Sequence, residues 1–315
     1  MIYTITFTPA LDYVIHTNKL VMGGTNRAAS ELIHFGGKGI NVATMLHNLG
    51  RESVALGFVA GFTGRAIEDG LARQGLRTDF IHLDQGLTRI NVKIKGDQET
   101  EINGQGPAIS PTALSKLFAQ LDNFRPEDVL VLAGSIPKSM PKAIYAEILQ
   151  KLEPQGVKVV VDAIGELLVK TLPHRPFLIK PNLEELENVV DRKLDDIQSI
   201  EVAARSLQEQ GARNVLVSLG AGGTLLIDEF AHVHRVHAPV GQVVDSVGAG
   251  DSTIAGFLDG YLDTHNYAYA VLEGTAAGSA TAFSEGIALA TTVSELIDQM
   301  NRAKGGPIRR SDSLG

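Results

Sequence analysis

The stretch NVATMLHNLGRESVALGFV, residues 41–59, contains both kinds of secondary structure on which this fold depends. Its first half is an amphipathic helix pattern with four apolar residues on one face: Val42, Met45, Leu46 and Leu49. Gly50 follows directly and suits a helix C-terminal cap. Its second half, SVALGFV at 53–59, is a continuous apolar run typical of a strand covered on both faces. The stretch therefore predicts a helix followed by a buried strand.

Similar apolar runs recur along the chain, and helical patterns separate them. They are IYTITF (2–7), DVLVLAG (128–134), VKVVVD (157–162), FLIK (177–180) and NVLVSLG (214–220). Strands that alternate with helices usually pair in parallel, because each helix carries the chain back along the sheet. We therefore expect an α/β fold with a doubly wound, mostly parallel sheet flanked by helices.

Residues 11–35 and 88–104 do not follow this pattern and predict short strands of their own. In the second stretch three apolar residues alternate with three polar ones: Ile90, Val92 and Ile94 with Asn91, Lys93 and Lys95. GDQ at 96–98 suits a hairpin turn. We expect a small antiparallel sheet that serves as a lid, as a dimer surface, or as both. No linker separates it, so residues 1–315 are expected to form a single domain, with a loose tail over the last eleven residues.

Composition excludes several classes of function. The formal charge of −8 disfavours nucleic acid or an anionic membrane as the main partner, because long-range forces would be repulsive. The chain has no cysteine, which excludes disulfides, thiolate metal sites and a cysteine nucleophile. The N-terminal MIYTITF lacks a basic signal region, and no apolar run is long enough to span a bilayer. We therefore expect a cytoplasmic protein.

FGGKGIN, at 35–41, is the first candidate site. It has neither the Walker spacing nor the GxGxxG dinucleotide spacing. Its glycines let the backbone approach a ligand, while Lys38 offers a cation and Asn41 a hydrogen-bonding group at the start of a helix. The alternative interpretation is a glycine turn with Asn41 as the helix cap.

Two further stretches follow predicted strands. In KPNLEELE (180–187) Asn182 and Glu185 have the spacing of a capping box, which is a sufficient structural explanation. The functional alternative places both at the carboxyl end of a strand, with Glu185 ordering water around Mg²⁺. SLGAGG (218–223) is either a turn into the hairpin strand TLLID or a bare backbone surface for an adenine ring.

DSVGAGDST, at 245–253, is the fourth candidate. Its glycines lead into a helix with a clear apolar face: Ile254, Phe257, Leu258 and Tyr261. Free N–H groups at such a helix start form an anion site. Asp251 in the first turn either complements the helix dipole or accepts a proton from a hydroxyl that attacks the bound anion.

Together these stretches resemble the PfkB branch of the ribokinase-like sugar kinases. The resemblance covers nearly the whole chain in this order: MIYTITFTPALDYVI, GGKGIN, AGSIP (133–137), KPNLEELE, SLGAGG and DSVGAGDS. It implies a ribokinase-like fold and MgATP-dependent phosphorylation of a sugar phosphate. Within the branch the chain is most similar to bacterial 1-phosphofructokinases, which convert fructose 1-phosphate to fructose 1,6-bisphosphate, with tagatose-6-phosphate kinases as the alternative.

The resemblance also implies roles for individual residues. Asp251 matches the general base, and the anion hole falls on the backbone of Gly248, Ala249 and Gly250. The positions that match sugar-phosphate contacts are Asp12, Arg27, Gly37, Lys38, Asn41, Arg89, Asn103 and Ser135. The positions that match the ATP and Mg²⁺ side are Lys180, Asn182, Glu185 (to the metal through water), Ser218, Gly220, Gly223 and Ser246. A homodimer through the lid is implied as well.

Two departures from the family pattern lie on the sugar side. Thr8 stands where relatives usually have Asn, and INGQGP at 102–107 replaces the usual INEPGP. Both place the identity of the sugar in question rather than phosphoryl transfer. Two other classes stay open: a non-catalytic sugar-phosphate sensor, and a nicotinamide-dependent dehydrogenase, which the missing dinucleotide fingerprint disfavours.

Overall fold

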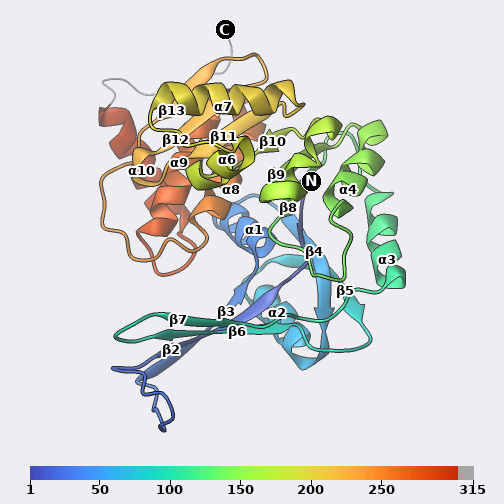
Figure 1. Cartoon of the computed structure of the whole chain (residues 1–315), viewed down its shortest axis with the longest axis vertical. Coiled ribbons are helices and arrows are strands. Elements are labelled where there is room, and N and C mark those ends of the chain that lie inside the picture. The colour runs from blue at the N-terminus through green and yellow to red at the C-terminus, as the bar shows by residue number, and fades with distance from the viewer. Residues whose placement is uncertain (304–315) are drawn as a thin grey trace.

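A nine-stranded sheet forms the centre of the molecule (Figure 1). The structure is a computed structural model that describes residues 1–303, so the predicted tail lies outside the described residues. The strand order across the sheet is β13 (Val233–Val236), β12 (Thr224–Ile227), β11 (Asn214–Ser218), β10 (Leu178–Ile179), β9 (Lys158–Asp162), β8 (Val129–Ala133), β1 (Ile2–Thr6), β4 (Ser53–Ala60) and β5 (Arg77–Leu83). All pairs from β11 to β5 are parallel, whereas β12 and β13 pair antiparallel.

Helices cover both faces of this sheet, as the doubly wound prediction requires. One face packs against α1 (Lys38–Asn48), α2 (Gly61–Arg73), α8 (Ala249–Thr264), α9 (Tyr267–Ala282) and α10 (Ala290–Ala303). The other packs against α3 (Pro111–Leu121), α4 (Ile144–Leu152), α5 (Gly165–Val169), α6 (Leu183–Val190) and α7 (Ile197–Glu209). Short 3-10 turns lie at Glu153–Gln155, Leu172–His174 and Gly220–Gly222. Among the described helices none is both long and apolar enough to cross a bilayer.

The apolar runs of the sequence are strands because both sides of each one are buried. In β8, Val129 and Val131 pack into the core on the α8 side, while Leu130 and Leu132 pack into the core on the α4 side. The six predicted runs correspond to β1, β4, β8, β9, β10 and β11. β5 was not predicted, because it is an edge strand with polar residues that break the apolar run.

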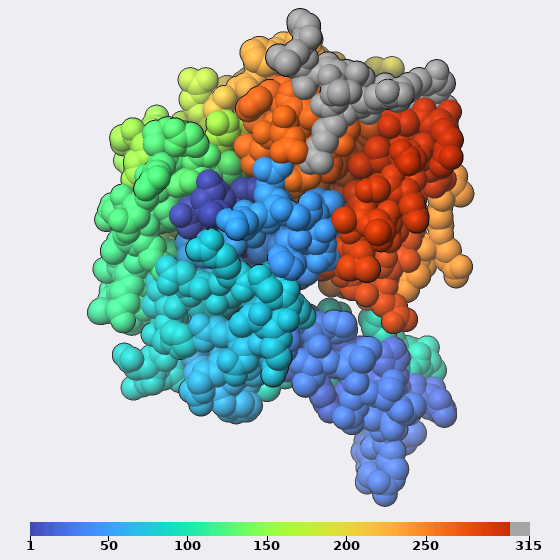
Figure 2. All heavy atoms as spheres, turned by 180° about the vertical axis from the view of Figure 1, so that it is seen from behind, coloured from blue at the N-terminus to red at the C-terminus, as the bar shows by residue number. Residues whose placement is uncertain are grey.

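The predicted lid is a separate four-stranded sheet. Its order is β3 (Ser30–Gly36), β2 (Ala10–His16), β6 (Arg89–Lys95) and β7 (Thr100–Asn103). The two outer pairings are antiparallel, and the central pair β2 and β6 is parallel, because the chain passes through β4 and β5 before it returns as β6. Seen from behind, the blue part of the lid projects below the body of the molecule (Figure 2).

The ends of α1 confirm the interpretation of Gly50. This residue has φ of +85°, and its N–H donates to the carbonyl of His47, while the N–H of Arg51 donates to that of Leu46. This is the Schellman arrangement, which needs a residue in the left-handed region after the helix.

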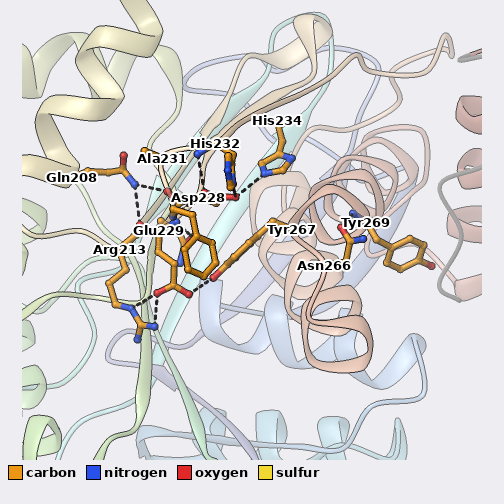
Figure 3. A network of polar contacts seen from close by, with 12 residues as sticks. Gln208, Arg213, Asp228, Glu229, Ala231, His232, His234, Asn266, Tyr267 and Tyr269 are labelled. Atoms are coloured by element: carbon orange, nitrogen blue, oxygen red, sulfur yellow. Dashed lines mark hydrogen bonds and ion pairs between the residues drawn. The ribbon is translucent and has the colours of Figure 1, made fainter. Parts of the chain in front are cut away.

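A polar network holds the hairpin of β12 and β13, the two outermost strands on one side of the large sheet (Figure 3). The buried carboxylate of Asp228 contacts the rings of His232 and His234, at 3.2 Å and 2.8 Å. Next to it, Glu229 accepts hydrogen bonds from Arg213 and from the hydroxyl of Tyr267. The network fixes the hairpin whose far end carries the glycine-rich turn described below.

Candidate active site

The carboxyl ends of the parallel strands meet the N-termini of two helices at one edge of the large sheet. Helix α1 begins directly against the end of β1, since a Cβ on Gly39 would lie 2.6 Å from Oγ1 of Thr6. Asp162 is the last residue of β9, and Lys180 directly follows β10. Asp251 lies in the first turn of α8. This edge is where open α/β sheets bind their ligands.

Asp162 pairs with two lysines at this edge. Its Oδ2 lies 2.9 Å from Nζ of Lys38, and its Oδ1 lies 3.4 Å from Nζ of Lys180. Burial would raise the pKa of this carboxyl, but Lys180 and Lys38 outweigh burial and lower it. The sequence analysis did not single out Asp162; the one signal for it is a charged residue that ends the buried run VKVVVD.

Asp251 is a buried carboxyl with a raised pKa. Its side chain is only 5% exposed, and Oδ2 accepts a hydrogen bond of 2.8 Å from Nδ2 of Asn41. Burial first, and then the negative charge of Asp162, raise its pKa to about 6. A carboxylate with such a pKa can accept a proton near neutral pH.

The start of α8 is free of side-chain caps, as an anion site requires. Its N-cap is Gly248, at φ of +81°, and no side chain caps the helix. The N–H of Ala249 donates to the carbonyl of Ser246 at 3.2 Å, so this group already has a partner. A Cβ on Gly250 would lie 3.1 Å from Nζ of Lys180, which brings an ammonium group to the same helix end.

The interpretation of Asn41 as a helix cap is wrong. The N-cap of α1 is Gly37, at φ of +126°, and the N–H of Ile40 in its first turn donates to Oγ1 of Thr6 at 3.1 Å. The side chain of Asn41 points across to Asp251 instead. The N-termini of α1 and α8 therefore share one site with two lysines and two carboxylates, Asp162 and Asp251.

On the predicted nucleotide side the structural interpretations of two motifs are confirmed. Asn182 and Glu185 form a complete capping box at the start of α6, with both hydrogen bonds at 2.8 Å. SLGAGG makes a single 3-10 turn between β11 and β12, closed by a bond from the N–H of Leu219 to the carbonyl of Gly223. Gly223 is confined to glycine, since it has φ of +89° and a Cβ there would lie 2.0 Å from the carbonyl of Val236.

The other nucleotide-side positions lie near these motifs. Ser218 ends β11 and pairs with Asn182 in an isolated bridge. Gly220 has φ of +57°, and a Cβ there would meet no other atom within 4 Å. Ser246 is exposed in the segment before α8. Although Glu185 caps α6, it still lies close enough to the site for its negative charge to contribute to the raised pKa of Lys38.

The lid presents polar side chains on the face that carries Asp12. Asn91 donates a hydrogen bond of 2.8 Å to Oδ1 of Asp12, and Nζ of Lys93 lies 3.5 Å from Oδ2. Nζ of Lys95, further along the same strand, contacts Asp245 just before α8 at 3.1 Å. Strand β6 of the lid thereby contacts both Asp12 on the lid and the segment that leads into α8. Asn91 and Lys93 were absent from the predicted site, although their alternation with apolar residues was visible.

Thr8, one of the two departures, joins three of the sugar-side segments. Its hydroxyl lies 3.4 Å from the carbonyl of Ser135 and 3.5 Å from that residue's Oγ, and its own carbonyl accepts a bond from Nε of Arg89. Thr8 and Arg89 line a small pocket together with Gln105, which belongs to the second departure. Burial lowers the pKa of Arg89, and the negative charge of Asp12 only partly offsets this effect.

The comparisons with known proteins agree on one family. The family model described as "pfkB family carbohydrate kinase" matches residues 7–292. The chain belongs to the pfkB carbohydrate kinase family. It is 41% identical over 300 residues to a 1-phosphofructokinase of Bacillus subtilis, covering 95% of this chain and 98% of the relative. A D-tagatose-1-phosphate kinase of Bacillus licheniformis is 34% identical, with 91% and 94% covered.

A solved structure supports the same assignment. Phosphofructokinase-2 from Escherichia coli superposes with a TM-score of 0.89 at 27% identity, over 95% of this chain and 98% of that one. The pfkB chain is therefore an ATP-dependent sugar kinase with a ribokinase-like fold and a lid.

Within this kinase, most but not all of the predicted site residues come together. Lys38, Asn41, Lys180 and Asp251 meet at the edge of the large sheet, while Asp12 and Arg89 lie on the lid beside them. Asn103 is exposed at the end of β7, opposite Asn91. Arg27 is exposed in the loop between β2 and β3, with no hydrogen bond or ion pair to another described residue. Its role stays a prediction.

Proposed function

We propose that this kinase transfers the γ-phosphoryl group of MgATP to the free primary hydroxyl of fructose 1-phosphate, which yields fructose 1,6-bisphosphate and ADP. One observation carries the proposal: a buried carboxyl with a pKa of about 6 lies in the first turn of a helix whose N-terminus has no side-chain cap, with the ammonium of Lys180 at the same helix end. The similarity to the 1-phosphofructokinase of Bacillus subtilis supports the choice of sugar.

In the proposed reaction Asp251 takes the proton of the attacking hydroxyl. The N–H groups at the start of α8 other than that of Ala249, together with the ammonium of Lys180, stabilise negative charge on the transferring group. Asn41 holds the carboxylate of Asp251 in place through Oδ2. Closure of the lid over the sugar excludes water, which otherwise competes as the acceptor.

Mg²⁺ fits this site as an ion bound to the nucleotide, which the protein would contact through water. The described residues contain no group of three or more His, Asp or Glu side chains that could hold a metal by themselves. Glu185 uses Oε2 for the helix cap, so its other oxygen is the one that would accept from a metal-bound water. When bound to the nucleotide, the ion neutralises phosphate charge.

ADP release with purified protein and MgATP tests the proposal. Four sugars are compared in parallel: fructose 1-phosphate, fructose 6-phosphate, tagatose 1-phosphate and tagatose 6-phosphate. A clear preference for the first supports the proposal. A preference for tagatose 1-phosphate would favour the second candidate, which the Bacillus licheniformis relative suggests. If none of the four sugar phosphates gives ADP release, both candidates are contradicted and the non-catalytic sensor becomes the favoured interpretation.

Arg89→Ala should raise the KM for the sugar phosphate by about a hundredfold and leave the KM for MgATP within about twofold. Its half-buried guanidinium is proposed to bind the phosphate already present on the sugar. Steady-state kinetics with each substrate varied in turn measures the effect. An increase confined to the KM for MgATP would show that Arg89 is assigned to the wrong substrate.

We propose that two copies of this chain pair through the outer face of the lid. A row of apolar side chains crosses all four of its strands on the face opposite Asp12: Ile33, Tyr13, Val92 and Ile102. The row is left uncovered at both ends, where Ile33 is 53% and Ile102 61% exposed. An exposed apolar sheet face of this kind is typical of an interface.

Ile102→Lys should therefore convert a dimer into a monomer at micromolar concentration, measured by light scattering after size exclusion. Val202→Lys on α7, which changes an equally exposed apolar residue far from the lid, is the matched control and should leave the mass unchanged. A monomeric wild-type chain would contradict the dimer. The division into one domain over 1–315 and a cytoplasmic location also remain predictions.

A further inference from the structure

The buried amide of Asn91 has a hydrogen-bonding arrangement that folding alone does not explain. Asn91 is 7% exposed in β6, where it stands in register with Asp12 on β2. Nδ2 donates to Oδ1 of Asp12, while Oδ1 of Asn91 has no partner among the described residues. The orientation is determined, because a carboxylate only accepts and the amide must turn its NH₂ group toward it.

An acceptor buried without a partner lowers stability, so Oδ1 of this amide does not favour asparagine at position 91. The benefit of an asparagine here must therefore lie in what its donor does to Asp12. That carboxylate is held on both oxygens, by Asn91 on Oδ1 and by Lys93 on Oδ2.

Asp12 is also confined from the other side. A Cβ on Gly36 would lie 2.9 Å from Oδ2, so the carboxylate packs against the backbone that leads into Gly37 and α1. Lys93 is shared with Glu101, at 3.9 Å, and its contact with Asp12 is longer than a hydrogen bond. The short bond from Asn91 is therefore the one that sets the direction of the carboxylate.

We propose that Asn91 is a positioning residue for the sugar: it aims the carboxylate of Asp12 at the hydroxyls of the bound sugar phosphate. This inference rests on the proposed function. It assigns part of the affinity for the sugar phosphate to a buried residue of the lid that acts through Asp12.

Asn91→Leu tests the inference, with the sugar phosphate that the wild-type chain turns over best. We expect the KM for that sugar phosphate to rise about tenfold and the KM for MgATP to stay within about twofold. Gln120→Leu on α3 is the matched control. Gln120 likewise donates once, to the carbonyl of Asp79, and leaves its own oxygen without a partner, but far from the site. It should leave both KM values unchanged.

A double-mutant cycle with Asp12→Ala separates positioning from a general effect on the lid. If Asn91 acts through Asp12, Asn91→Leu adds less than about a twofold change once Asp12 is gone. Independent effects that multiply, or an equal rise in both KM values, would overturn the inference. A wild-type chain that turns over no sugar phosphate would instead overturn the proposed function.

Discussion

Turnover is expected to fall about a thousandfold when Asp251 is replaced by asparagine, because the attacking hydroxyl loses its proton acceptor. Asparagine has the same shape and can still accept the hydrogen bond from Asn41, so the site keeps its geometry. The KM for MgATP should change little, since the start of α8 and Lys180 remain in place. Single-turnover measurement of ADP formation separates the chemical step from product release.

The same residue predicts the acid limb of the pH profile. A general base works only when deprotonated, and the pKa of Asp251 is raised to about 6, mainly by burial. Activity should therefore be half-maximal near pH 6 and should fall at lower pH. Near-normal turnover in Asp251→Asn, or a wild-type profile that stays flat down to pH 5, would contradict the assignment of the base.

Asp162→Asn is expected to lower both stability and activity. The substitution leaves Lys180, which is 5% exposed, and the partly exposed Lys38 without their anionic partner. Removing one member of a buried ion pair costs about 3 kcal/mol of unfolding free energy. Urea denaturation measures this loss. Turnover should fall as well, because both lysines then lose the contact that fixes their positions.

Asp162→Asn should also move the acid limb of the pH profile. The negative charge of Asp162 is, after burial, the second cause of the raised pKa of Asp251. Its removal lowers that pKa, so the limb shifts to lower pH. Asp228→Asn is the matched control, since it changes a buried carboxylate that pairs with two histidines on the distant hairpin. That variant should lose stability without moving the limb; a limb that moves equally in both would show that Asp162 does not act on Asp251 directly.

Local patterns in the sequence were enough to predict the central strands of the large sheet and several of the helix ends, but not the edge strand β5. Continuous β-branched runs predict strands buried on both faces, and β8 shows why, with alternate residues in two different cores. Gly50 and the pair Asn182 and Glu185 were assigned correctly, since caps depend on residues within one turn of the helix end.

Contacts between distant segments were not visible in the sequence. Asn41 looked like a helix cap, but its partner Asp251 lies 210 residues further along the chain. Asp162 gave almost no signal, because one charge at the end of a strand acquires meaning only when Lys38 and Lys180 are placed on either side of it. The parallel pairing of β2 with β6, which brings Asn91 to Asp12, depends on where the chain re-enters the lid.

The sequence by itself thus determined the α/β class, the strands and the motifs of a sugar kinase, because periodicity, turn residues and caps act over a few neighbouring residues. The tertiary structure alone decided which charges meet, the raised pKa of Asp251 and the direction in which Asp12 is held. Those properties arise from burial and from contacts across the sheet, and strand order determines both.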